Sequence, residues 1–194
     1  MVSRQLDFKM AVFIDDRLKD VGLAQRAILQ KDARALFIEA ARCCYGIREQ
    51  GGNNSGPTVE LIQETVGGHS REAWCMSFVQ TCLAYVEEKL KVKSPILVSE
   101  HCLTVWSSTP KEQRVKFFPL PGAIAIWRHG SSSNGHTGIV LGADDKTFHS
   151  IEGNTEHGED PNGKVVRDGG GVYFLERSMH PTGDMKLVGF LKPF

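Results

Sequence analysis

The sequence has no excess of charge of either sign. Its 194 residues include 23 Lys and Arg and 23 Asp and Glu, so the formal net charge is zero. A protein that tracks nucleic-acid phosphates needs a surplus of basic residues to displace counterions. We therefore expect no nucleic-acid partner, although a local basic patch is compatible with this balance. Hydrophobic residues make up 41% of the chain and charged residues 24%, which is typical of a folded domain with a sizeable core.

Long apolar runs are also missing. The first twenty residues carry a charge every few positions, unlike the apolar segment of a signal peptide. Nowhere do 18 apolar residues follow one another, as a membrane-spanning helix requires. We expect a monomer made in the cytoplasm without a signal peptide or a membrane anchor.

Cysteines are few and lack the spacing of metal-binding pairs. There are five of them, an odd number, and none forms a C-x-x-C pair. This pattern argues against a zinc ribbon and against the disulfide framework of a small secreted protein. It leaves open one working thiol among buried, inert ones. The five are Cys43, Cys44, Cys75, Cys82 and Cys102.

Apolar periodicity predicts helices in the first half of the chain. Residues 14–45 have the spacing of one or two amphipathic helices, with Gly22 as a candidate break. Further helices are predicted over 58–66, capped by its first residue Thr58, and over 75–90. Residues 96–106 fit either a helix or a strand followed by a helical turn.

After Pro119 the pattern changes to that of strands joined by Gly-, Ser- and Asp-rich turns. Helices followed by a strand meander predict an α+β fold, with N-terminal helices packed on an antiparallel sheet of about five strands. The predicted strands are 123–127, 137–141, 147–152, 171–177 and 187–192.

Cys75 is the best placed of the five thiols to act as a nucleophile. It follows a polar stretch and opens a predicted helix, where unpaired N–H groups and the helix dipole favour a thiolate. Cys43 and Cys44 end a helix, and Cys82 lies in mid-helix on the buried face. The alternative for any single cysteine is a small buried hydrophobe.

A base and an orienting group for this thiol can be found in the strand region. His136 opens the strand 137–141 between small residues, and the next strand ends at Glu152 and Asn154. If the two strands are antiparallel neighbours, the start of one lies beside the end of the other. The sequence thus predicts a nucleophile, a base and an orienting Glu or Asn in one place.

Three segments carrying these residues resemble one family. The run EAWCMSFVQTCL is similar to the nucleophile helix of the CHAP and NlpC/P60 superfamily of papain-like cysteine peptidases and amidases. PLPGAIAIWRHGSSSNGHTGIVLG resembles the strand pair that carries the family's histidine, and FHSIEGNT the strand after it. The three motifs occur in the family's order over 41–154, and the last strand, GFLKPF, fits as well.

The resemblance implies a role for each matched residue. Cys75 would be the nucleophile and His136 the general base, while Glu152 and Asn154 would orient the imidazole and stabilise its charge. The backbone N–H of Cys75 would contribute to an oxyanion hole. Trp74 and Trp127 would shape a substrate groove, with packing in the core as the alternative for at least one of them.

No cofactor or metal is expected. Some relatives bind calcium through an acidic loop before the cysteine, but residues 50–58 contain no carboxylate. Glu156, His157, Glu159 and Asp160 cluster in one loop, and we interpret them as solvated because their spacing is not that of metal ligands.

The function implied is hydrolysis of an amide bond in peptidoglycan through a thioester, by an endopeptidase or an N-acetylmuramoyl-L-alanine amidase. We expect a phage or prophage endolysin that reaches the cell wall after release from the cytoplasm. The alternatives are a secreted antibacterial effector or an acyl transferase with the same site, and an inactive wall-binding module. Residues 41–194 would form the hydrolase domain and residues 1–40 a helical extension packed on it.

Overall fold

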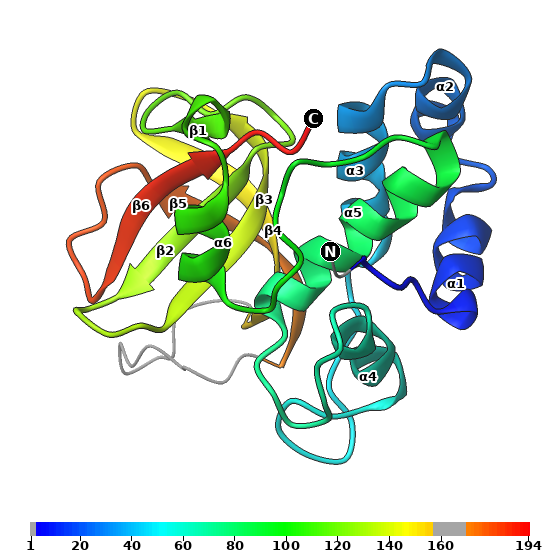
Figure 1. Cartoon of the computed structure of the whole chain (residues 1–194), viewed down its shortest axis with the longest axis horizontal. Coiled ribbons are helices and arrows are strands. Elements are labelled where there is room, and N and C mark those ends of the chain that lie inside the picture. The colour runs from blue at the N-terminus through cyan, green and yellow to red at the C-terminus, as the bar shows by residue number, and fades with distance from the viewer. Residues whose placement is uncertain (1–2, 157–169) are drawn as a thin grey trace.

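A computed structural model describes residues 3–156 and 170–194 and shows a group of helices beside one antiparallel sheet (Figure 1). The helices are α1 (Phe8–Leu18), α2 (Gly22–Gln30), α3 (Ala33–Cys43), α4 (Pro57–Glu64), α5 (Cys75–Leu90) and α6 (Cys102–Ser108), followed by a 3-10 turn at Lys111–Gln113. The strands are β1 (Arg114–Val115), β2 (Ile124–His129), β3 (Gly135–Ala143), β4 (Thr147–Thr155), β5 (Gly171–Ser178) and β6 (Met185–Leu191). Their order in the sheet is β1-β6-β2-β3-β4-β5.

The α+β prediction is confirmed, and so are the five predicted strands. The sheet has one further strand in the described residues, β1, which pairs with β6 at the sheet edge. Sequence periodicity missed β1 because two residues are too few to show an alternation. The prediction that strands 137–141 and 147–152 are antiparallel neighbours is also confirmed, since Ile139 pairs with Ile151.

The N-terminal helical region differs from its prediction. Residues 14–45 lie in three helices, not in one or two. Gly22 marks a break, as predicted, and opens α2. The second break was missed: Lys31 is left-handed, and the Asp32 carboxylate then caps α3 by accepting from the N–H of Ala35 at 2.9 Å.

Two other helix assignments are corrected. Gly56, not Thr58, is the N-cap of α4, because Pro57 already occupies the first turn, where its missing N–H costs nothing. Residues 96–106 contain no strand, and α6 begins only at Cys102.

The long helix α5 is the centre of the fold. Every residue from Cys75 to Val86 is buried, between α3 and α4 on one side and the strands β3 and β4 on the other. Ile139 and Ile151 pack with α5 in the main apolar cluster, whereas Trp127 and Phe148 pack in a smaller cluster with β6. Because α5 is enclosed in this way, the position of its first residue is fixed by the core.

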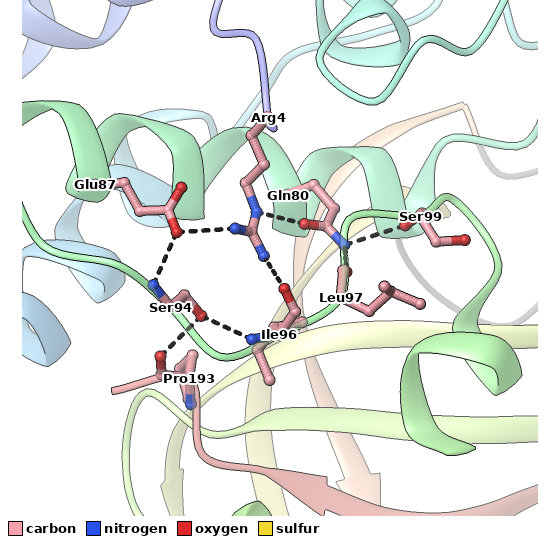
Figure 2. A network of polar contacts seen from close by, with 8 residues as sticks. All are labelled: Arg4, Gln80, Glu87, Ser94, Ile96, Leu97, Ser99 and Pro193. Carbon is pink, nitrogen blue, oxygen red and sulfur yellow. Dashed lines mark hydrogen bonds and ion pairs between the residues drawn. The ribbon is translucent and has the colours of Figure 1, made fainter. Parts of the chain in front are cut away.

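The N-terminal segment is tied to α5 and to the loop that follows it. Figure 2 shows the Arg4 guanidinium donating to Gln80 Oε1, Glu87 Oε1 and the Ile96 carbonyl, at 2.5, 2.9 and 2.6 Å. The Gln80 amide in turn donates to the carbonyl of Leu97 at 2.7 Å. The loop that leads to α6 is therefore held against the side of α5.

A division of the chain at residue 40 stays a proposal. That residue lies within α3, and Met10 and Ile14 of α1 belong to the same buried cluster as α5. In the parts of the chain that the structure describes, no helix is long and apolar enough to cross a membrane.

Candidate active site

Cys75 is the first residue of α5 and directly follows the N-cap, Trp74. The first helical hydrogen bond runs from the N–H of Phe78 to the Trp74 carbonyl, at 2.9 Å. Residues 75–77 therefore present their N–H groups at the positive end of a 16-residue helix. The position predicted from sequence is confirmed, with 6% of Cys75 exposed.

His136 and Glu152 are hydrogen-bonded across neighbouring strands. His136 Nε2 lies 2.8 Å from Glu152 Oε2, and both side chains are buried. Gly138 makes this contact possible, because a Cβ at that position would meet Glu152 Cγ at 2.4 Å. The glutamate side chain thus crosses β3 where β3 has no side chain.

Glu152 is held as a carboxylate by two further partners. Arg177 of β5 forms a bidentate ion pair with it, at 2.9 Å to Oε1 and 2.5 Å to Oε2, and the Ser150 hydroxyl donates to Oε1 at 2.5 Å. Burial alone would raise the pKa of Glu152, but the hydrogen bonds from Arg177 and His136 hold this pKa at about 2. A fixed negative charge therefore faces the imidazole at neutral pH.

The electrostatics favour a thiolate and an imidazolium. A hydrogen bond from Cys102, whose Sγ is 3.8 Å from that of Cys75, lowers the pKa of Cys75 well below its usual value, and His136 lowers it further against the effect of burial. Burial would lower the pKa of His136, but its hydrogen bonds to Cys75 and Glu152 raise this pKa to about 9. Because Glu152 occupies Nε2, Nδ1 is the ring nitrogen left to face the thiolate.

The other predicted site residues are Asn154, Trp74 and Trp127. Asn154 has a left-handed backbone, with φ of 52°, in the register shift between Glu152 and Thr155 of the β4–β5 pairing, and its role in orienting His136 stays a prediction. Trp74 is fully buried, and its indole N–H donates to Glu49 Oε1 at 2.9 Å. Trp127 is also buried, with its ring 5.7 Å from that of His136.

The two buried tryptophans pack against elements that carry the site residues. Trp127 packs against Phe148 on one side and lies 5.6 Å from the Arg177 guanidinium, so it fixes the layer that carries His136. Trp74 anchors the N-terminus of α5 through Glu49. Their contribution to a substrate groove stays a prediction.

Sequence reasoning missed three neighbours of the site: Cys102, Arg177 and Ser150. Ser150 shares a strand face with Glu152 at a spacing of two, and that alternation was the available signal. Cys102 and Arg177 are 27 and 25 residues from their partners, with no motif to connect them. Only tertiary packing places Cys102 beside Cys75 and Arg177 beside Glu152.

Most of the acidic loop that follows β4 lies outside the described residues. Glu156 is exposed, while His157, Glu159 and Asp160 lie outside the described residues, so their interpretation as a solvated loop stays a prediction. Among residues 3–156 and 170–194, no group of three or more His, Cys, Asp or Glu side chains could hold a metal ion.

Comparison with known proteins identifies this region. Residues 67–154, which include Cys75, His136, Glu152 and Asn154, match the family model described as the CHAP domain. No curated protein and no solved structure matches the chain significantly.

Proposed function

Because the chain contains a CHAP domain, part of the papain-like CHAP/NlpC-P60 group whose members are typically cell-wall amidases or peptidases, we propose that it hydrolyses an amide bond of peptidoglycan. The observation that carries the proposal is the arrangement of Cys75 at the start of α5 with His136 held 2.8 Å from the Glu152 carboxylate. These are a nucleophile, an acid–base group and its orienting charge.

The reaction begins from the ion pair. The Cys75 thiolate attacks the amide carbonyl carbon and forms a tetrahedral oxyanion. The His136 imidazolium then gives its proton to the leaving amine, so the C–N bond breaks and a thioester remains on Cys75. The neutral imidazole next takes a proton from water, which hydrolyses the thioester and restores the ion pair.

Glu152 stabilises the charge on His136 throughout the cycle. Its own charge is secured by Arg177, so the proton of the imidazolium is not lost to the carboxylate. The oxyanion is stabilised by N–H groups in the first turn of α5, including that of Cys75, where the helix dipole also favours negative charge.

Clearing of purified peptidoglycan sacculi by the protein tests this function. We expect turbidity to fall with the wild type and to stay constant with Cys75→Ala. Mass spectrometry of the products identifies the bond: free peptides with an N-terminal L-alanine indicate an amidase, and glycan-linked fragments with new amino termini inside the peptides indicate an endopeptidase. Intact sacculi after treatment with protein shown by circular dichroism to be folded would contradict the proposal.

The biological setting that we propose is release from the cytoplasm by a phage or prophage, with the protein acting as a monomeric endolysin. Expression in the bacterial cytoplasm should then leave cells intact until a pore-forming agent opens the inner membrane, after which turbidity should fall within minutes. Lysis that needs no such agent would contradict this setting. Light scattering of the purified protein tests the oligomeric state.

A further inference from the structure

We propose that Cys75 and Cys102 form a redox-modification site, in which a peroxide converts the two thiols into a disulfide that reversibly blocks the nucleophile. The effect on catalysis rests on the proposed function. The formation of the bond does not, because it depends only on the two sulfurs and their surroundings.

The two sulfur atoms are already in contact. Cys75 Sγ and Cys102 Sγ are 3.8 Å apart, and both cysteines are free, with exposed fractions of 6% and 4%. A disulfide needs a sulfur–sulfur distance of about 2.05 Å. Bond formation therefore requires the two sulfurs to move about 1.75 Å closer together.

The position of Cys102 is set by elements far apart in sequence. Its side chain packs on the start of β3, where a Cβ at Gly135 would lie 3.0 Å from Cys102 Cβ. The loop before α6 is fixed to α5 through Gln80 and Arg4 (Figure 2). Because α6 is held at these points, its first residue, Cys102, stays beside Cys75.

The chemistry is that of a peroxidatic and a resolving cysteine. The Cys75 thiolate attacks one oxygen of the peroxide, the O–O bond breaks, and the hydroxide released takes up a proton to become water. Cys75 is then a sulfenic acid. The Cys102 sulfur loses its proton and attacks the Cys75 sulfur, the S–O bond breaks, and a second water leaves. Two thiols have been oxidised by two electrons, and the peroxide has accepted them.

The chain contains a second group of thiols that serves as an internal comparison. Cys44 interacts with both Cys43 and Cys82, and the interactions that shift the pKa values of Cys43 and Cys44 involve no histidine. The hydrogen bond to Cys44 and burial raise the pKa of Cys43. The hydrogen bond to Cys43 lowers the pKa of Cys44, but Cys82 and burial together raise it well above its usual value. Oxidation needs a thiolate to begin, so a peroxide should select the pair at the active site.

Peptide mapping after treatment with hydrogen peroxide and alkylation tests the proposal. Before alkylation, we expect the intact mass of the oxidised protein to fall by the mass of two hydrogen atoms. After alkylation and digestion, we expect a linked peptide that joins Cys75 to Cys102. Activity on sacculi should fall more than about tenfold and return after dithiothreitol. The mass readout needs no substrate, so a protein that forms the linkage but leaves sacculi intact would refute only the proposed hydrolase function.

Variants separate the switch from simple oxidation of the nucleophile. In Cys102→Ser and Cys102→Ala, Cys75 should advance to a sulfinic acid that dithiothreitol does not reverse. Cys43→Ser, which changes a thiol outside the site, should behave as the wild type. Direct sulfinic acid formation in the wild type, or a linked peptide confined to the Cys43, Cys44 and Cys82 group, would overturn the proposal.

Discussion

At the scale of single residues, the site depends on a pair of groups that are useful only together. In the proposed mechanism Cys75 acts as the nucleophile because Cys102 and His136 stabilise its negative charge, and His136 keeps its proton because Cys75 and Glu152 surround it. Each group therefore sets the protonation state of the other, and the apparent pKa values belong to the pair.

Removing either member of the pair should abolish turnover without unfolding the protein. We expect Cys75→Ala and His136→Ala to lower kcat by about three orders of magnitude or more, because nucleophile and base act as a unit. Initial rates of sacculus clearing and circular dichroism of each variant check this. Full activity in either variant would rule out the assigned roles.

The pH dependence of kcat/KM should report the charge of His136. In the proposed mechanism the active form is the thiolate with the imidazolium, so activity should decline as the pH rises through about 9, where His136 loses its proton. On the acid side, activity should decline only well below the usual pKa of a thiol, where Cys75 becomes protonated.

Glu152→Gln should move the alkaline limb of this profile to lower pH. The amide cannot stabilise the imidazolium, so the pKa of His136 falls, and kcat should drop by about a hundredfold or more. Glu176→Gln is the matched comparison, because it makes the same change at a side chain that is 62% exposed, and it should leave the alkaline limb in place. An unshifted limb in Glu152→Gln would show that Glu152 does not set the charge of His136.

At the scale of elements, the strand β3 carries the histidine and also makes room for its partner. Gly138 leaves a gap over which the Glu152 side chain reaches His136, and Gly135 leaves a gap for Cys102. A strand with larger residues at these positions could form the same ladder but could not form the same site. The small residues of this segment are thus explained by close approach rather than by turns.

Gly138→Ala should therefore damage the site more than the sheet. The added Cβ would meet Glu152 Cγ at 2.4 Å and push the carboxylate away from His136. We expect activity to fall by at least about tenfold while the far-ultraviolet spectrum stays unchanged. Gly142→Ala on the same strand has nothing within 4 Å of its new Cβ and should keep wild-type activity. Equal activity in the two variants would contradict this account.

At the scale of the whole molecule, the N-terminal segment helps to hold the loop that carries Cys102. The Arg4 side chain is 3% exposed, and its partner Glu87 is 11% exposed. Removing one member of a buried ion pair leaves the other charge uncompensated, which costs much more than the loss of a surface pair.

Arg4→Met should consequently destabilise the protein by about 3 kcal/mol, which corresponds to a fall in Tm of about 6–12 °C for a chain of this size. Lys19→Met is the control, because Lys19 and Asp16 form an exposed pair with side chains 64% and 69% exposed. Its Tm should stay within about 2 °C of the wild type. Thermal unfolding followed by circular dichroism checks both, and an equal Tm for the two variants would show that the Arg4 network is not a structural tie.

The parts of the fold that sequence predicted well are those with a strong local pattern. The α5 helix was found at its true ends because a polar stretch precedes Cys75 and apolar residues then recur on a helical period. The break that was missed, at Lys31, and the cap that was misplaced, at Thr58 instead of Gly56, depend on one or two residues each. The strand β1 forms by pairing with β6, and no local sequence pattern predicts it.

The sequence by itself determined the α+β layout and the position of Cys75 at a helix start, and it proposed His136 together with Glu152 or Asn154 as partners of that thiol. These follow from periodicity, from capping and turn chemistry, and from motifs within short segments. Only the tertiary structure decided that Arg177 secures the charge of Glu152 and that Cys102 lies 3.8 Å from the nucleophile. The physical reason is that side chains 25 and 27 residues apart are brought together by packing, whose outcome depends on the whole core and leaves no local periodicity.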